Sequence, residues 1–67
     1  MTQKERVFEY LQRNGSMTAL DGVTYLGIID LAGRIRDLRK LGVNVKSTPE
    51  TVVNRFGEPC RIVRYSL

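Results

Sequence analysis

Basic side chains in the second half of the chain have the type and clustering that suit the binding of an anion. Residues 30–67 hold eight Lys and Arg against four Asp and Glu, whereas residues 1–29 hold three of each sign. The whole net charge of +4 therefore lies in the second half. This asymmetry indicates that one half builds a scaffold and the other meets an anionic partner. Solubilising surface charge is the alternative, because a charge of this size is normal for a small domain.

The sequence contains few of the residues that catalysis or metal binding would require. The chain has no His, and its single Cys, Cys60, has no neighbouring base to activate it and no second Cys for a disulfide. The acidic residues are scattered rather than paired at the spacing of an active site. We therefore expect no enzyme activity, no metal site and no cofactor.

The length and composition predict one small domain that spans residues 1–67. The apolar content of 42% is typical of a globular chain and too high for a disordered one. No apolar run approaches the ~20 residues of a membrane span, and the first residues lack the apolar core of a signal peptide. We expect a cytoplasmic protein without membrane contact. A homodimer is compatible with this view, because the core of so short a chain is marginal.

Two helices are expected in the first half of the chain, and each is followed by a glycine. The first covers about residues 3–14, where Thr2 and Glu5 have the spacing of a capping box. The second covers about residues 19–26. Its inward-facing residues are expected to be Leu20, Val23 and Leu26.

The third expected helix covers about residues 31–41 and carries much of the basic charge. Asp30 is a plausible N-cap for it. Its apolar stripe is formed by Leu31, Ile35 and Leu38. On the helical wheel the residues opposite this stripe are Gly33, Arg36, Asp37 and Lys40. The residues that flank the opposite side are Ala32, Arg34 and Arg39.

After Gly42 the sequence pattern changes from helix to strand. Strand composition is found at Val43, Val45 and residues 51–53, and again at Ile62, Val63 and Tyr65. Residues 54–58 lie between them and contain Gly57, which predicts a β-hairpin. Ser16 and Met17 are expected to form a short extended link. Two helices joined by a Gly-containing turn and followed by a hairpin predict an α+β winged helix-turn-helix, with three helices and a two-stranded wing.

The chain resembles the small winged helix-turn-helix proteins of bacteriophages and prophages over essentially its whole length. The segments that carry the resemblance are residues 15–18, 26–28, 31–42, 54–57 and 64–67. The Arg-Ile-x-Asp-Leu-Arg run closed by Gly42 is the most specific of them. The resemblance implies a DNA-binding regulator fold. Such helices usually open with a small hydroxyl residue followed by Arg or Lys, where this chain has Ile29 and Asp30.

These observations lead to the hypothesis that the chain binds double-stranded DNA as a phage or prophage transcriptional regulator or an excisionase-like factor. With the third helix in the major groove, Arg36 and Lys40 would approach base edges, and Arg34 and Arg39 would neutralise phosphates. The hairpin tip would contact the backbone or minor groove. The expected DNA-binding residues are Ala32, Gly33, Arg34, Arg36, Arg39, Lys40, Lys46, Arg55 and Phe56.

A second hypothesis is a winged-helix module that binds and modulates a host or phage protein. It is favoured by the acidic Asp30, by the missing side chain at Gly33 and by the apolar Phe56 at the hairpin tip. The Arg residues of the third helix would then be solvated and paired with Asp37 and its neighbours.

Under either hypothesis, Lys46, Arg61 and Arg64 are expected on the outer face of the sheet, where they would contact phosphates or protect an exposed strand edge from pairing with another chain. Edge protection is favoured for Arg61 and Arg64.

Overall fold

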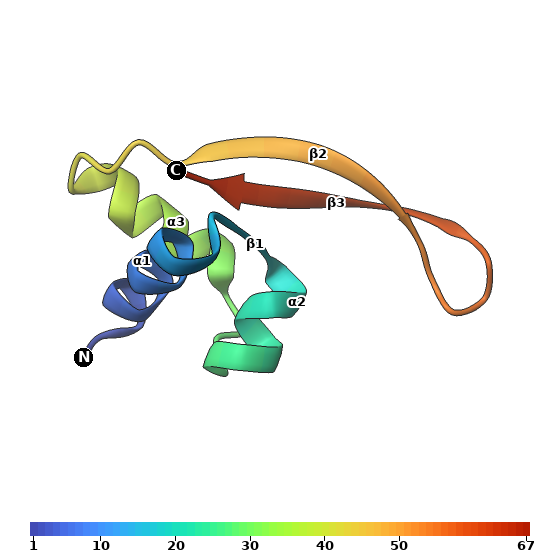
Figure 1. The fold of residues 1–67 in the computed structure, drawn as a ribbon, viewed down its shortest axis with the longest axis horizontal. Coiled ribbons are helices and arrows are strands. Elements are labelled where there is room, and N and C mark those ends of the chain that lie inside the picture. Colours follow the sequence, from blue (N-terminus) through green and yellow to red (C-terminus); the bar gives the residue numbers. More distant parts are fainter.

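The chain folds into a body of helices and a long β-hairpin that extends away from it, as the computed structural model shows (Figure 1). The structure describes all residues 1–67. The helices are α1 (Gln3–Asn14), α2 (Ala19–Asp21), the π-helix η1 (Gly22–Leu26) and α3 (Leu31–Lys40). The strands are β1 (Ser16–Thr18), β2 (Lys46–Val53) and β3 (Pro59–Ser66). The predicted order of helices and hairpin is confirmed. None of the helices combines the length and apolar character needed to cross a membrane.

Local capping interactions begin the first two helices. The Thr2 hydroxyl accepts a hydrogen bond from the Glu5 amide at 3.3 Å, and the Glu5 carboxylate accepts one from the Thr2 amide at 3.1 Å. This second bond is the main reason why the pKa of Glu5 is lowered. Thr18 and Asp21 make the same reciprocal pair at the start of α2, at 2.9 and 3.3 Å. Both capping boxes satisfy amides that have no partner inside their helix.

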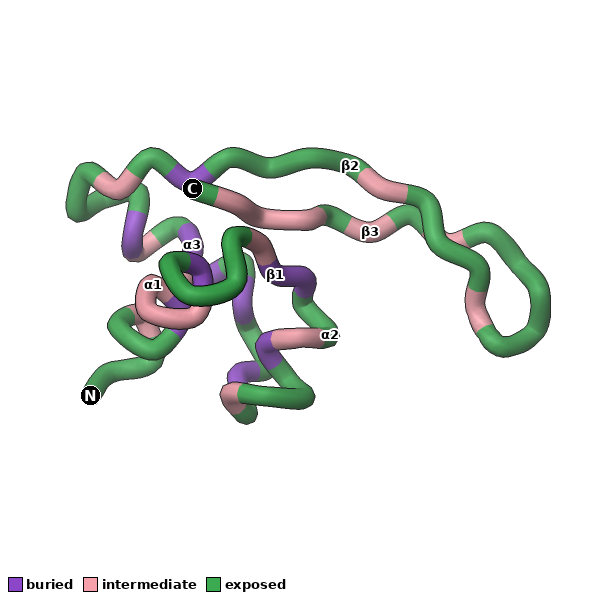
Figure 2. The backbone as a smooth tube through the Cα atoms, in the orientation of Figure 1, coloured by how far each residue is buried: buried purple, intermediate pink, exposed green.

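The buried core lies in the helical body and not in the hairpin (Figure 2). It consists of Val7, Leu11, Met17, Ile28, Leu31, Ile35, Leu38 and Val45. The apolar stripe predicted for α3 supplies three of these residues, and α1 supplies two. Tyr65, near the end of β3, packs against this core and so joins the hairpin to the body.

The second helix differs from its prediction in which side faces inward. Leu20 and Val23 were expected to be buried, but their exposed fractions are 73% and 50%. The reason is that α2 gives way to the wider turn of η1, so the 3.6-residue spacing does not apply. Gly22 is the buried residue of this segment, and a Cβ there would lie 3.6 Å from the Leu31 Cβ.

The sheet has three antiparallel strands in the order β1-β3-β2. Ser16 and Met17 were expected to be a link, but with Thr18 they form β1, in which Met17 lies opposite Tyr65. Arg64 connects all three strands. Its Nε donates to the Glu50 carboxylate at 3.1 Å, and its Nη1 donates to the Ser16 hydroxyl at 3.2 Å. Arg64 therefore lies between two strands, and its predicted place at an exposed edge is wrong.

Arg39 connects the end of α3 to the start of β2. Its guanidinium donates two hydrogen bonds to the Val45 carbonyl, at 2.8 and 3.2 Å, and one to the Ser47 hydroxyl at 2.7 Å. Because the chain reverses direction at Gly42, where φ is +92°, these groups come within reach of the helix.

Substitution of Arg39 tests this structural role. We expect Arg39→Met to lower the free energy of unfolding by about 1–2 kcal/mol, because it removes these hydrogen bonds. Arg36→Met is the matched control, since it removes the same charge from an exposed position and should change stability by less than about 0.5 kcal/mol. Urea denaturation followed by circular dichroism measures both. Equal stability of the two variants would contradict the structural role of Arg39.

Candidate nucleic-acid interface

A stripe of exposed residues runs along α3 at every fourth position, through Ala32, Arg36 and Lys40. All three are exposed, as the sequence predicts. Neither Arg36 nor Lys40 makes a side-chain hydrogen bond or ion pair within the protein. Their charged groups are therefore available to an external anion.

Ile29 lies just before the N-cap of α3, and sequence reasoning did not include it among the candidate residues. Its exposed fraction is 88%. A residue just before an N-cap often packs against an apolar residue at the fourth helical position, but here that position is Arg34. Ile29 thus has no apolar partner, and this missing partner is a sequence signal that could have identified it.

Gly33 does not face outward as predicted. It is buried, and its amide donates to the Asp30 carboxylate at 3.0 Å, which confirms Asp30 as the N-cap. A Cβ built at position 33 would collide with that carboxylate. Gly33 therefore accommodates the cap, and its predicted place on the outward face of the helix is wrong.

Arg34 and Arg39 were expected to neutralise phosphates, but both are engaged within the protein. The Arg34 Nε lies 3.1 Å from a carboxylate oxygen of Asp37. The contact is an ion pair without hydrogen-bond alignment, because that Nε has no hydrogen-bond partner. Its Nη1 donates to the Gln3 side chain at 3.4 Å. Arg39 holds β2 as described above, so the free charge of α3 is reduced to Arg36 and Lys40.

Most of the acidic side chains are also engaged within the protein. Three of the seven cap helices, namely Glu5, Asp21 and Asp30. Three more form ion pairs, namely Glu9, Asp37 and Glu50. Only the side chain of Glu58 has no partner. By contrast, the basic side chains without a partner are Lys4, Arg6, Arg36, Lys40, Lys46, Arg55 and Arg61.

The hairpin tip presents Arg55 and Phe56 on an ordered loop. The Asn54 side chain accepts hydrogen bonds from the Phe56 and Glu58 amides at 2.9 and 3.0 Å, and Gly57 adopts a φ of +76°. Phe56 is 78% exposed, so it does not fold back onto the domain. The tip lies at the far end of the molecule from α3 (Figure 1). Lys46 is exposed at the other end of the hairpin, so the structure does not bring the predicted residues into one patch.

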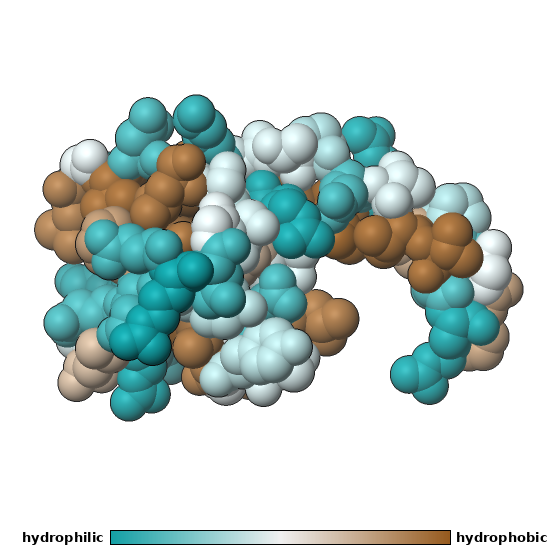
Figure 3. Space-filling view, in the orientation of Figure 1, coloured by the Kyte–Doolittle hydropathy of each residue, from teal (hydrophilic) through white to brown (hydrophobic).

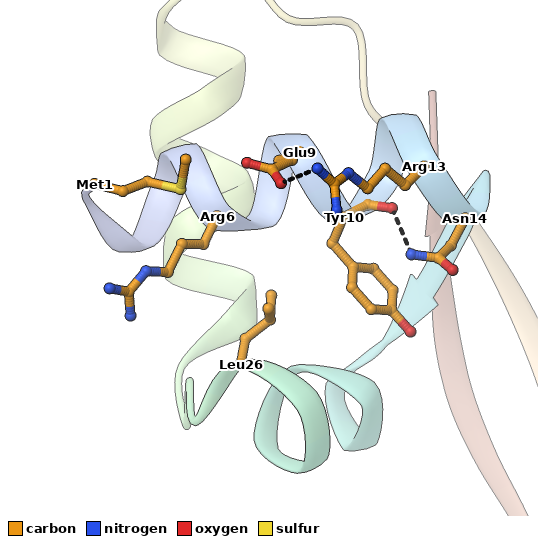
Figure 4. A pocket seen from close by; sticks show the side chains of 7 residues that line it. All are labelled: Met1, Arg6, Glu9, Tyr10, Arg13, Asn14 and Leu26. Atoms are coloured by element: carbon orange, nitrogen blue, oxygen red, sulfur yellow. Dashed lines mark hydrogen bonds and ion pairs between the residues drawn. The ribbon is translucent and has the colours of Figure 1, made fainter.

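A separate hollow of about 210 Å³ lies between α1 and η1 (Figure 4). Its lining residues are Met1, Arg6, Glu9, Tyr10, Arg13, Asn14 and Leu26. Arg13 pairs with Glu9 at 2.9 Å, and Tyr10 stacks on Tyr25 with ring centroids 6.0 Å apart. Desolvation, followed by the negative charge of Asp21, raises the pKa of Tyr10. The hollow is smaller than the ~300 Å³ at which small-molecule pockets begin.

Comparison with known families agrees with this architecture. Residues 2–67 match the family model described as a winged helix-turn-helix domain. The searches of curated proteins and of solved structures gave no match. Domains of this kind are typical of DNA-binding proteins that are not enzymes. The phage or prophage source implied by the resemblance stays a prediction. With the fold and the family model in agreement over nearly its whole length, the chain belongs to the winged helix-turn-helix family.

Proposed function

We propose that the protein binds double-stranded DNA and acts as a transcriptional regulator or an excisionase-like factor. The observation that carries this proposal is that nearly all acidic side chains have a partner within the protein, whereas most basic side chains have none. Six of seven acidic side chains are engaged in caps or ion pairs, while seven basic side chains have no partner. A surface of this kind attracts the phosphate backbone.

In this proposal α3 enters the major groove with the exposed stripe toward the bases. Arg36 and Lys40 donate hydrogen bonds to guanine edges or to phosphates, because neither has a partner within the protein. Ala32 lies at the start of this stripe and Ile29 lies just before the helix, and their exposed apolar groups suit the methyl group of thymine. The stripe is thus apolar at one end and basic at the other.

The hairpin supplies the second contact. Arg55 reaches the backbone or minor groove, and Phe56 lies beside it as an exposed apolar side chain. The hydrogen bonds of Asn54 hold the backbone of this tip in one conformation. Binding therefore requires little ordering of the loop, which limits the loss of conformational entropy.

Removal of one free cation from α3 tests the proposed interface. We expect Arg36→Gln to weaken binding to a duplex and, if it contacts a phosphate, to reduce the slope of log K against log salt by about 1. With about five phosphate contacts the parent slope should be about −4 to −5. Mobility shift in low salt measures both quantities.

The matched control is Arg13→Gln, which removes the same charge from α1, where the guanidinium pairs with Glu9. This variant should bind like the parent chain. Equal losses in the two variants would assign the effect to net charge alone. The absence of any shift at roughly 100 μM protein, where non-specific binding by such domains is expected, would reject DNA binding itself.

Asp30 offers a test in the opposite direction. We expect Asp30→Asn to keep the N-cap and to strengthen DNA binding about two- to fivefold, because it removes a negative charge beside the stripe. Asp30→Ala should instead lower stability by about 1 kcal/mol, because the cap is lost. Mobility shift and thermal denaturation separate these effects. A similar gain from Glu9→Gln on α1 would show that the position of the charge does not matter.

Selection of bound duplexes from a random pool tests the regulatory role. We expect one enriched motif that combines a guanine, read by Arg36, with a neighbouring A·T pair, read through its thymine methyl by Ile29. Ile29→Ala should then relax the preference at the A·T position and leave the guanine position unchanged. A pool without any enriched sequence would contradict a sequence-specific regulator.

A further inference from the structure

One edge of β3 is open over residues 59–63. On one side β3 pairs with β2 along its whole length, from Val53 opposite Pro59 to Lys46 opposite Ser66. On the other side β1 pairs only with residues 64–66, because the chain leaves the sheet at Thr18. The part of β3 nearer the hairpin tip therefore has a neighbouring strand on one side only.

The hairpin register determines which backbone groups face this edge. The Asn54 amide donates to the Glu58 carbonyl at 2.9 Å, so this pair is hydrogen-bonded. Because hydrogen-bonded and non-hydrogen-bonded pairs alternate in an antiparallel ladder, Cys60 and Ile62 bond to β2. The N–H and C=O groups of Arg61 and Val63 then point to the open edge, as those of Tyr65 point to β1.

An apolar hollow of about 240 Å³ lies beside this edge. Its lining residues are Thr18, Ala19, Leu20, Ile62, Val63 and Tyr65. Leu20 and Val63 are 73% and 41% exposed, which is unusual for large apolar side chains that face the same depression. Figure 3 shows apolar surface on the underside of the hairpin, across a concave gap from the body.

The outer edge of β2 does not offer the same site. The alternation that exposes Arg61 and Val63 on β3 places Ser47, Pro49 and Thr51 toward that outer edge. Pro49 has no N–H, so it interrupts the row of donors near its middle. The open edge of β3 is thus the part of the sheet that combines free donors and acceptors with an apolar hollow.

A second copy of the chain fits this edge poorly. Two-fold antiparallel pairing centred on Arg61 would place two Arg61 side chains directly opposite each other, which is repulsive. If the pairing were centred on Ile62, residues 58–60 of one copy would lie opposite residues 64–66 of the other. That copy's own β1 already pairs with residues 64–66 along the same edge, so the two would collide. DNA is also a poor occupant, because apolar side chains cannot neutralise phosphates.

We propose that this edge binds an extended segment of a partner protein, which adds to the sheet as a further strand. The segment carries an apolar side chain beside Val63 and an acidic one beside Arg61, two residues away on the same face. Arg61 has no partner within the protein, so it supplies the complementary charge. This surface is separate from the exposed stripe of α3, and the proposal goes beyond DNA binding.

Selection of heptapeptides from a random display library, in the presence of nuclease, tests the proposal. We expect enrichment of peptides in which an acidic and an apolar residue stand two positions apart. Selection on Arg61→Glu should replace the acidic preference with a basic one. No enrichment on the parent chain, or the same acidic motif on Arg61→Glu, would overturn the proposal.

The enriched peptide, labelled for fluorescence anisotropy, then tests the edge itself. Val63→Pro removes an N–H from the open edge without removing a bond to β2, and we expect about tenfold weaker binding. Thr51→Pro is the matched control on the outer edge of β2 and should bind like the parent. Leu20→Glu, which leaves both strands intact, should weaken binding about tenfold as well through the hollow.

Val63→Pro and Leu20→Glu should leave the DNA mobility shift unchanged, so failure of this proposal and failure of DNA binding are distinguishable. Peptide binding that survives both substitutions would overturn the proposed site. So would a dimer in light scattering that Val63→Pro abolishes, because the edge would then belong to a second copy.

Discussion

The pairing of Met17 with Tyr65 is the contact on which the rest of the structure depends. Met17 is fully buried in the helical core, and Tyr65 packs against that core from the end of β3. Without this junction the hairpin would be an isolated two-stranded ribbon, which is marginally stable in water. Arg64 strengthens the junction across the three strands, and Arg39 ties β2 to the end of α3. Together these contacts set the direction in which the wing leaves the body.

Contacts within the protein also explain why nearly all charged side chains that lack an intramolecular partner are basic, although the net charge is modest. Asp30 and Asp37 lie on or beside α3, and both have a partner within the protein. Asp30 accepts a hydrogen bond from the Gly33 amide and keeps its charge, whereas Asp37 pairs with Arg34. Capping and pairing thus engage the acidic side chains locally and leave Arg36 and Lys40 without an intramolecular partner. The net charge alone does not show which of the basic side chains are free in this way.

Features that depend on neighbouring residues could be predicted from the sequence, and features that depend on distant ones could not. The caps at Thr2 and Asp30, the core stripe of α3 and the hairpin loop all follow from local spacing. β1 was missed because three residues carry no periodicity and their partner strand lies about fifty residues away. The helical wheel also cannot show that a capping carboxylate covers Gly33, or that Arg39 reaches back to the Val45 carbonyl after the chain reverses.

Thr18 links the helix-turn-helix to the open edge of the sheet. It is both the last residue of β1 and the N-cap of α2, and its hydroxyl accepts the Asp21 amide. The capping geometry turns the chain away from the sheet, so β1 cannot continue alongside residues 59–63. Pro59 and the charge of Arg61 limit indiscriminate pairing along this edge. They do not block the amides of Arg61 and Val63. Thr18, which caps the start of the second helix, therefore also leaves an edge of the wing that is open to selective pairing with a further strand.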